Sequence, residues 1–219
     1  KNSKIPQNLF QQKVLRADES LKKAAIRAAV ESNESWRVSF LKNLGVDFDT
    51  ELEKSQTALH IACADGNVTL ITELLLAGAN SNVVDKNGNT PLHLYFSRRT
   101  WIDPIVIKLL IKSGAMVNRP NAIGETALHK ACDLNHWQAV DRLIELGADV
   151  NANTYVESPL HLALRKSHVM IGRSLISCGA DPFCLDVDNK TPLQLLYENH
   201  SETEALKLLK FYCRLSHSS

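Results

Sequence analysis

Four histidines recur at matching positions of the sequence and are the first residues whose chemistry has to be considered. Each follows a threonine or serine by three residues, and they are His60, His93, His129 and His161. An imidazole can bind a metal ion or transfer a proton near neutral pH. Shared coordination requires ring nitrogens about 2.1 Å from one ion, whereas helices packed side by side lie about 8–10 Å apart. If the four rings line up along a stack of repeats, they are too far apart to share a metal ion.

The other reactive residue types form no recognisable catalytic motif. The cysteines are an odd number without the spacing of a zinc site, and they are Cys63, Cys132, Cys178, Cys184 and Cys213. The chain contains no G-x-S-x-G, no G-x-x-x-x-G-K and no H-E-x-x-H motif. We therefore predict no enzymatic activity, no cofactor and no metal ion. The cysteine pattern predicts an intracellular location, in the cytoplasm first and in the nucleus as the alternative.

Composition and charge restrict the kind of partner. The chain has 219 residues, of which 44% are apolar, enough for one sizeable domain or two small ones. Its 25 Lys and Arg against 24 Asp and Glu give a net charge of +1, far below that of a typical nucleic-acid binder. No apolar stretch approaches the roughly 20 residues that cross a bilayer. We expect a partner protein, and neither nucleic acid nor direct membrane insertion.

A four-residue motif recurs five times and identifies the elements that must position the histidines. Its copies begin at Thr57, Thr90, Thr126, Ser158 and Thr191 and read Thr-Ala-Leu-His, Thr-Pro-Leu-His, Thr-Ala-Leu-His, Ser-Pro-Leu-His and Thr-Pro-Leu-Gln. Consecutive copies are 33, 36, 32 and 33 residues apart. A Gly-Ala pair follows four of them in phase, at Gly78, Gly114, Gly147 and Gly179. Two landmarks in phase predict stacked structural repeats.

Each landmark has a physical role in a pair of helices. The hydroxyl of Thr57 can accept an N–H that the first helical turn leaves unpaired, and a following proline such as Pro91 removes no helical hydrogen bond. Leu59 and Cys63 have the spacing of a buried helical face. Gly78 can adopt the left-handed conformation that ends the second helix. The motif therefore predicts a capped first helix, a second helix and a turn-rich loop in every unit.

These residues and their period resemble the ankyrin repeat. The resemblance implies an all-α ankyrin-repeat solenoid of helix-turn-helix units joined by β-hairpin loops, in which each histidine bonds its own helix start and the neighbouring hairpin. We predict an N-terminal extension or linker over residues 1–19 and a repeat domain over 20–219. Its units span roughly 20–52, 53–85, 86–121, 122–153, 154–186 and 187–219. The first and last are degenerate caps with polar outer faces, in keeping with Arg27 and Gln194 at motif positions.

Positions that the repeat does not require are available for recognition. In proteins that look like this one, partners meet the hairpin tips and the exposed side of each first helix. The candidates are Arg98, Arg99, Trp101, Ile123, Glu125, Asp133, Leu134, Tyr155, Val156, Arg165 and Lys166. The apolar tip residues either contact the partner or pack within their own hairpin. The cations either bind an acidic or phosphorylated segment or form an ordinary solvated face.

Three tryptophans fall near the turn between the two helices of their units. They are Trp36, Trp101 and Trp137, and the turn that holds Trp101 is three residues longer than its equivalents. The rings either form an exposed aromatic ridge or pack onto their own helices.

Together these features predict a protein-protein interaction module, monomeric in isolation, that binds a partner through its concave face and hairpin tips. One alternative is the docking or regulatory arm of a larger enzyme or channel, such as a kinase, ubiquitin ligase or cation channel, and Lys1 at the first position is consistent with a fragment. Another is self-association. In similar proteins, intracellular hydroxylases modify the hairpin asparagine that is here Asn82, Asn118 or Asn151.

Overall fold

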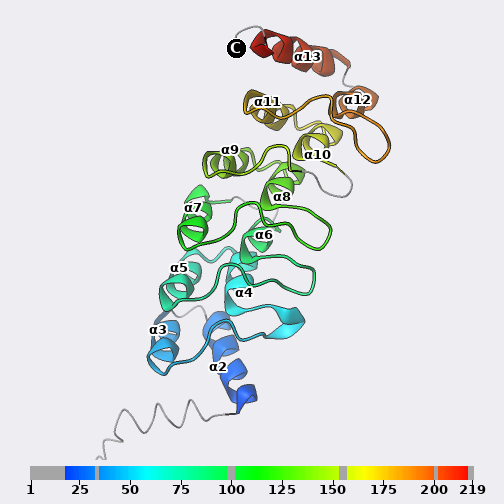
Figure 1. Cartoon of the computed structure of the whole chain (residues 1–219). Helices are drawn as coiled ribbons and strands as arrows, with labels where there is room; N and C mark the ends of the chain where they lie inside the picture. Colours follow the sequence, from blue (N-terminus) through cyan, green and yellow to red (C-terminus); the bar gives the residue numbers. More distant parts are fainter. Residues whose placement is uncertain (1–17, 33–34, 98–101, 153–156, 200–201, 217–219) are drawn as a thin grey trace, which may run out of the picture. The chain divides into compact units, whose positions relative to one another are not determined.

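The computed structural model describes residues 18–32, 35–97, 102–152, 157–199 and 202–216 (Figure 1). The chain divides into two compact units, each of which is larger than one of the predicted repeats. The first consists of residues 1–98 with 112–115, and the second of residues 99–111 with 116–219.

The first unit is built from short helices in two rows. Its elements are α2 (Glu19–Glu31), α3 (Ser35–Asn43), the 3-10 helix η1 (Glu53–Ser55), α4 (Ala58–Asp65), α5 (Val68–Ala77) and α6 (Pro91–Tyr95). Helix α4 packs against both α2 and α6, and α3 packs against α5. First helices therefore stack on first helices and second helices on second helices, as the repeat predicts.

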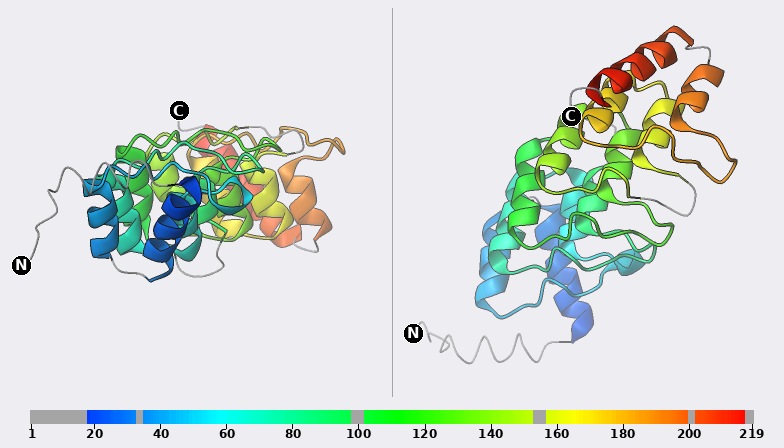
Figure 2. Two further views of the ribbon diagram at one scale, coloured as in Figure 1. Left: turned by 90° about the horizontal axis from the view of Figure 1, so that it is seen from below. Right: turned by 45° about the horizontal axis from the view of Figure 1, so that its top comes forward.

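The second unit repeats this arrangement. Its elements are α7 (Pro104–Lys112, whose last residue belongs to the first unit), α8 (Ala127–Asp133), α9 (Trp137–Glu145), α10 (Pro159–Arg165), α11 (Val169–Ser177), α12 (Pro192–Glu198) and α13 (Glu202–Ser216). One row is formed by α8, α10 and α12, and the other by α9, α11 and α13 (Figure 2). Helix α13 is the longest of the second helices, with 15 residues.

The helix boundaries confirm the roles predicted for the motif residues. Thr57 and Ser158 are the N-cap residues of α4 and α10. The Ser158 hydroxyl accepts the N–H of the residue three positions later at 3.4 Å. Gly78 ends α5 with a φ of 98°, and the N–H of Ala79 then donates to the carbonyl of Leu74 at 3.0 Å. This left-handed residue satisfies a carbonyl that the helix end would otherwise leave unpaired.

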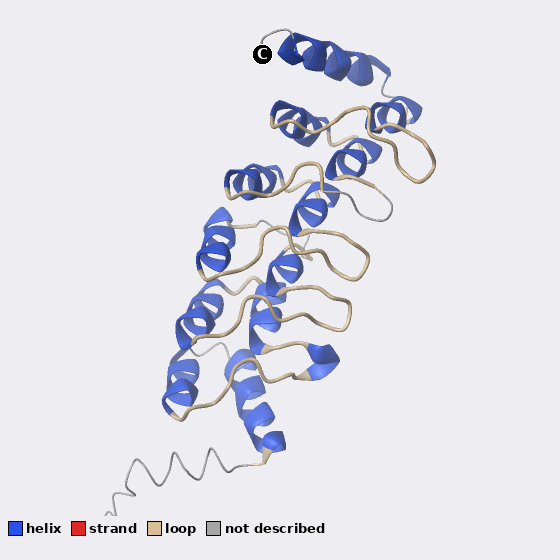
Figure 3. Cartoon of the chain, in the orientation of Figure 1, coloured by secondary structure: helices blue, strands red, loops and turns tan. Residues whose placement is uncertain are grey.

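Long loops join each second helix to the next first helix, and the described residues contain no strand (Figure 3). The predicted hairpin geometry is present at the loop tips. The N–H of Asp85 donates to the carbonyl of Asn89 at 2.9 Å, and the N–H of Asp186 donates to that of Lys190 at 3.0 Å. Each tip is thus closed by a short backbone ladder that does not extend into a sheet.

The core of each unit lies between its two rows of helices. In the first unit Leu59, Ile71 and Leu74 are completely buried. Full burial of a leucine or isoleucine side chain stabilises the fold by about 1.5–3 kcal/mol. Cys63 and Cys132 are each buried within their own unit, and burial raises the pKa of both thiols, so that they stay protonated. These two cysteines therefore pack as small apolar residues.

The prediction of a polar outer face is wrong for the last helical pair. Arg27, at the other end of the chain, is exposed and forms an ion pair with Glu53 at 2.9 Å. In contrast, Tyr197 on α12 and Leu206 on α13 are 56% and 50% exposed. No later helix in the described part of the chain covers them. The repeat-unit boundaries and the 1–19 extension stay predictions, and residues 1–17 lie outside the described residues.

Candidate functional site

The recurring histidines connect one repeat to the next. The Nδ1 atom of His60 accepts the N–H of Thr57 at 3.1 Å, and its Nε2 atom donates to the carbonyl of Asn89 at 3.0 Å. His161 makes the same bridge, from the N–H of Ser158 at 3.3 Å to the carbonyl of Lys190 at 3.0 Å. Because a carbonyl can only accept, both rings carry their proton on Nε2. The rings thus hold a helix start against the following hairpin.

Burial keeps both bridging rings neutral. It lowers the pKa of His60 and of His161 below the usual 6.5, and this effect outweighs the hydrogen bonds to the carbonyls of Asn89 and Lys190, which favour the charged form. Protonation would place a second donor at Nδ1, facing the N–H of Thr57 or Ser158. The imidazoles are therefore structural groups that acid disrupts.

The protein is expected to lose stability as the pH falls from about 7.5 to 5.5. The unfolded chain takes up protons below about 6.5, whereas the folded rings resist protonation, so stability is complete above this pH and declines below it. The double substitution His60→Gln and His161→Gln should flatten this decline. Glutamine can accept the same N–H at the helix start without titrating, because Gln194 Oε1 at this motif position accepts the Thr191 N–H at 2.7 Å.

Urea titrations at several pH values, followed by circular dichroism, measure this effect. The comparison is the slope of the free energy of unfolding against pH in the wild type and in the double variant. An equally steep slope in both proteins would assign the acid sensitivity to other groups.

The hairpin tips are held rigidly by carboxylate or amide side chains. Oδ1 of Asp85 accepts the N–H groups of Asn87 and Asn89 at 2.8 and 2.9 Å. Oδ1 of Asn121 accepts those of Ile123 and Glu125 at 3.1 and 2.9 Å. Partial burial by itself would raise the pKa of Asp85, but the hydrogen bonds from Asn89 and Asn87 together bring it below its usual value. Each tip is therefore fixed without help from its outward-pointing side chains.

In the second unit these rigid tips carry exposed apolar side chains. Ile123 is 59% exposed, and Leu185 and Val187 on a later loop are 56% and 60% exposed. Ile123 is thus not packed within its own hairpin. Val187 is at a predicted hairpin-tip position but was not singled out as a site candidate, and Leu185 was not predicted. The two residues flank Asp186 in the apolar-polar alternation Leu-Asp-Val-Asp, which places both side chains on one side of an extended segment. Tyr155 and Val156 lie outside the described residues.

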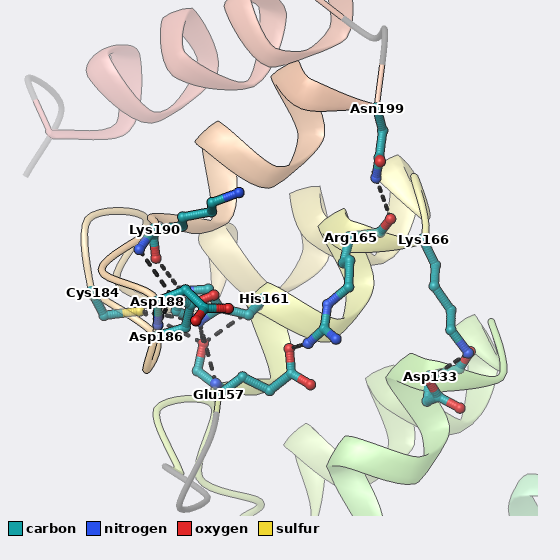
Figure 4. A network of polar contacts seen from close by, with 11 residues as sticks. Asp133, Glu157, His161, Arg165, Lys166, Cys184, Asp186, Asp188, Lys190 and Asn199 are labelled. Carbon is teal, nitrogen blue, oxygen red and sulfur yellow. Dashed lines mark hydrogen bonds and ion pairs between the residues drawn. The ribbon is translucent and has the colours of Figure 1, made fainter.

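Two of the predicted charged residues of the second unit pair with each other between neighbouring first helices, and a third pairs within its own repeat (Figure 4). Lys166 Nζ lies 2.6 Å from Asp133 Oδ1, joining α10 to α8. Arg165 forms an ion pair with Glu157, a mostly buried carboxylate that the motif analysis did not single out. These cations are thus already partly neutralised within the protein.

The remaining candidates are distributed as follows. Glu125 pairs with Lys130 on α8, and Leu134, which ends α8, is half-buried. Arg98, Arg99 and Trp101 lie outside the described residues. Trp36 on α3 and Trp137 on α9 are 61% and 55% exposed, so neither ring is buried on its own helical pair.

Three hairpin asparagines link successive loops within each unit. The Nδ2 group of Asn82 donates to the carbonyl of Gly114 at 2.7 Å, that of Asn118 to Gly147 at 3.0 Å, and that of Asn151 to Gly179 at 2.9 Å. Hydroxylation of these residues stays a prediction. At the next equivalent position stands Phe183, whose ring packs edge-on against Tyr212 of α13 at a centroid distance of 5.4 Å.

Among the described residues, no three His, Cys, Asp or Glu side chains gather in a way that could hold a metal ion. Of the helices that the structure describes, none has both the length and the apolar character that crossing a bilayer requires.

Three features repeat in register along the chain: first helices with capped starts, second helices that end at a glycine, and hairpins held by side-chain hydrogen bonds. They define a helical repeat protein of the kind that presents its loops for binding. The chain belongs to the ankyrin-repeat family, whose model of three repeat copies matches residues 25–99, 59–154 and 100–186. The predicted family and the all-α solenoid class are thus confirmed. Ankyrin repeats are generally protein-protein interaction modules and are typically non-catalytic.

The chain is similar to segments of several much larger proteins. It is 33% identical over 146 residues to a nuclear factor NF-kappa-B subunit of Gallus gallus, covering 64% of this chain and 14% of that protein. It is 37% identical over 108 residues to a probable serine/threonine-protein kinase of Dictyostelium discoideum, covering 48% and 11%. It is 29% identical over 185 residues to the phosphocholine transferase AnkX of Legionella pneumophila, covering 83% and 18%. The chain thus spans less than a fifth of the length of these relatives.

Proposed function

We propose that this chain is a non-catalytic module that binds a partner protein through the hairpin tips and first helices of its second unit. The observation that carries the proposal is the exposure of Ile123, Leu185 and Val187 on loops whose backbones are already fixed by hydrogen bonds. Exposed apolar groups gain free energy when a partner covers them. A loop that is already ordered loses little entropy on binding.

Apolar contact is a better candidate than charge for the main part of the affinity. An acidic or phosphorylated partner segment would have to displace Glu157 from Arg165 or Asp133 from Lys166. An exposed pair such as Lys166–Asp133 contributes about 0–1 kcal/mol, so exchanging its carboxylate for another gains little. Displacing Glu157 would take a cation away from a mostly buried carboxylate, which is unfavourable. The charged rim is therefore proposed to select the orientation of the partner, and the apolar tips to hold it.

Affinity purification from cells of the source organism tests this function. The variant replaces Ile123, Leu185 and Val187 by serine, and the control replaces Lys86 and Asn87, on the polar tip of the first unit, by serine. We expect one or more proteins to be recovered by the wild type and the control but reduced at least tenfold with the variant, which corresponds to about 1.4 kcal/mol. All three chains must have the same melting temperature. Equal recovery by the variant would contradict the proposal.

A second candidate function is that of a docking or regulatory arm within a larger enzyme or channel. It is favoured by the low coverage of the relatives, which include the kinase above and a transient receptor potential cation channel homologue of Caenorhabditis elegans, matched at 35% identity over 10% of its length. An immunoblot of the native protein with an antibody against residues 20–219 distinguishes the two. A mass near 24.4 kDa would contradict the role as an arm of a larger protein.

The same antibody tests the proposed cytoplasmic location by cell fractionation.

A further inference from the structure

A groove runs along the row of second helices in the second unit. It has a volume of about 580 Å³ and lies among α9, α11 and α13. Its apolar walls are formed by Trp137 and Met170, which are 55% and 71% exposed, together with Ile171 and Phe211. The hairpin tips project from the other side of the helical pairs (Figure 1). The groove is therefore a surface separate from the tip residues of the proposed function.

One edge of the groove is basic. The guanidinium carbon of Arg173 lies 4.8 Å from the centre of the Phe211 ring, at the boundary with a second hollow of about 250 Å³. That hollow is lined by Lys207, Lys210 and Arg214. Lys207 is paired with Glu204 at 2.7 Å. In the part of the chain that the structure describes, Arg173 and Lys210 have no carboxylate partner.

Among the described residues that line the larger hollow, Asp141 is the only carboxylate, and it has a hydrogen-bond partner. Asp141 accepts a hydrogen bond from the Ser174 hydroxyl at 2.5 Å. Glu204, which lines the second hollow, is paired with Lys207, so Arg173 and Lys210 remain without a carboxylate partner in the described part of the chain. An incoming carboxylate beside Arg173 would gain a charge-assisted hydrogen bond, while an apolar side chain in the groove would cover Trp137 and Met170.

We propose that this groove docks a short partner segment in which a bulky apolar side chain is followed by acidic residues. The apolar side chain occupies the space among Trp137, Met170 and Phe211, and the carboxylates lie against Arg173 and Lys210. This inference rests on the proposed protein-binding function but uses different residues, so the two can fail independently. Apolar anchoring supplies affinity, and the basic edge fixes the direction of the segment.

Selection of a random linear peptide library on the full chain tests this proposal. We expect the enriched peptides to carry Trp, Phe, Leu or Met beside Asp or Glu. Their affinity should fall at least tenfold for the double variant Arg173→Glu and Lys210→Glu, and similarly for Trp137→Ser with Met170→Ser. The matched control is Lys108→Glu, an exposed lysine on α7 outside both hollows, and it should leave binding unchanged. Peptides whose acidic residues are replaced by lysine should regain affinity for the charge-reversed variant.

Several outcomes would overturn the groove as a peptide site. Enriched peptides without the apolar-acidic pattern, or binding that the groove variants leave unchanged, would do so. Peptides that respond to Ile123→Ser and Val187→Ser instead would overturn it while supporting the tip site. A mass by light scattering that doubles with concentration, and returns to that of one chain with Met170→Ser, would assign the groove to a second copy. Binding to phosphatidylserine vesicles through Arg173 and Lys210, with no peptide enriched, would assign it to a membrane surface.

Discussion

Replacing Leu74 by alanine is expected to lower the free energy of unfolding by about 2–5 kcal/mol, the largest effect of any single change considered. Leu74 lies on α5 and is completely buried between the two rows of helices of the first unit. The truncation removes apolar contacts and leaves a cavity that the surrounding helices can close only in part. Total stabilities of about 5–15 kcal/mol make this a large fraction of the whole.

The matched control lies on the same helix. Leu76 is two residues further along α5 and 67% exposed, so Leu76→Ala removes the same atoms from a site that is largely in water. Its effect should stay within about 0.5 kcal/mol. Urea denaturation with fluorescence and circular dichroism measures both variants. Similar losses of stability in the two variants would show that the two faces of α5 do not differ in burial as described.

The second large effect is expected for Gly172→Val on α11. An added Cβ atom at Gly172 would lie 2.5 Å from Cδ2 and 3.4 Å from Cγ of Leu164, and Leu164 is itself completely buried on α10. The added atoms overlap Leu164, so this buried side chain must shift against its packed neighbours or α10 and α11 must move apart. Overpacking of this kind costs about 1–3 kcal/mol.

The repeat suggests how this loss can be reversed. Leu164 stands at the motif position that Cys63 and Cys132 hold in other repeats, and Gly172 stands at the position of Ile71 and Val140. In the repeat of α10 and α11, a larger residue on the first helix is thus matched by a smaller one on the second.

Leu164→Cys combined with Gly172→Val recreates the pair found at Cys132 and Val140. The double variant should be more stable than the sum of the two single losses predicts, by a coupling of about 0.5–3 kcal/mol. The four members of the cycle can be measured by urea denaturation. Strict additivity would show that the two positions do not share their volume.

The sequence alone identified the parts of the fold that depend on local interactions. The N-cap of Thr57 and the helix stop at Gly78, predicted from the residues, and the bridge of His60, implied by the family resemblance, are confirmed. Each involves residues that recur with the same short spacing in most of the repeats. A repeated signal is also insensitive to variation in any one copy. The family and the all-helical class therefore follow from the motif.

The tertiary structure decided what happens at positions that do not repeat. The exposure of Ile123, the pairing of Lys166 with Asp133, and the close contact of Gly172 with Leu164 each depend on residues that are specific to one or two repeats. The groove beside Arg173 depends on how α13 packs against α11. Such contacts depend on the volumes and charges of specific neighbours. A period of about 33 residues fixes where a side chain lies in its unit, but only packing determines which neighbour it meets.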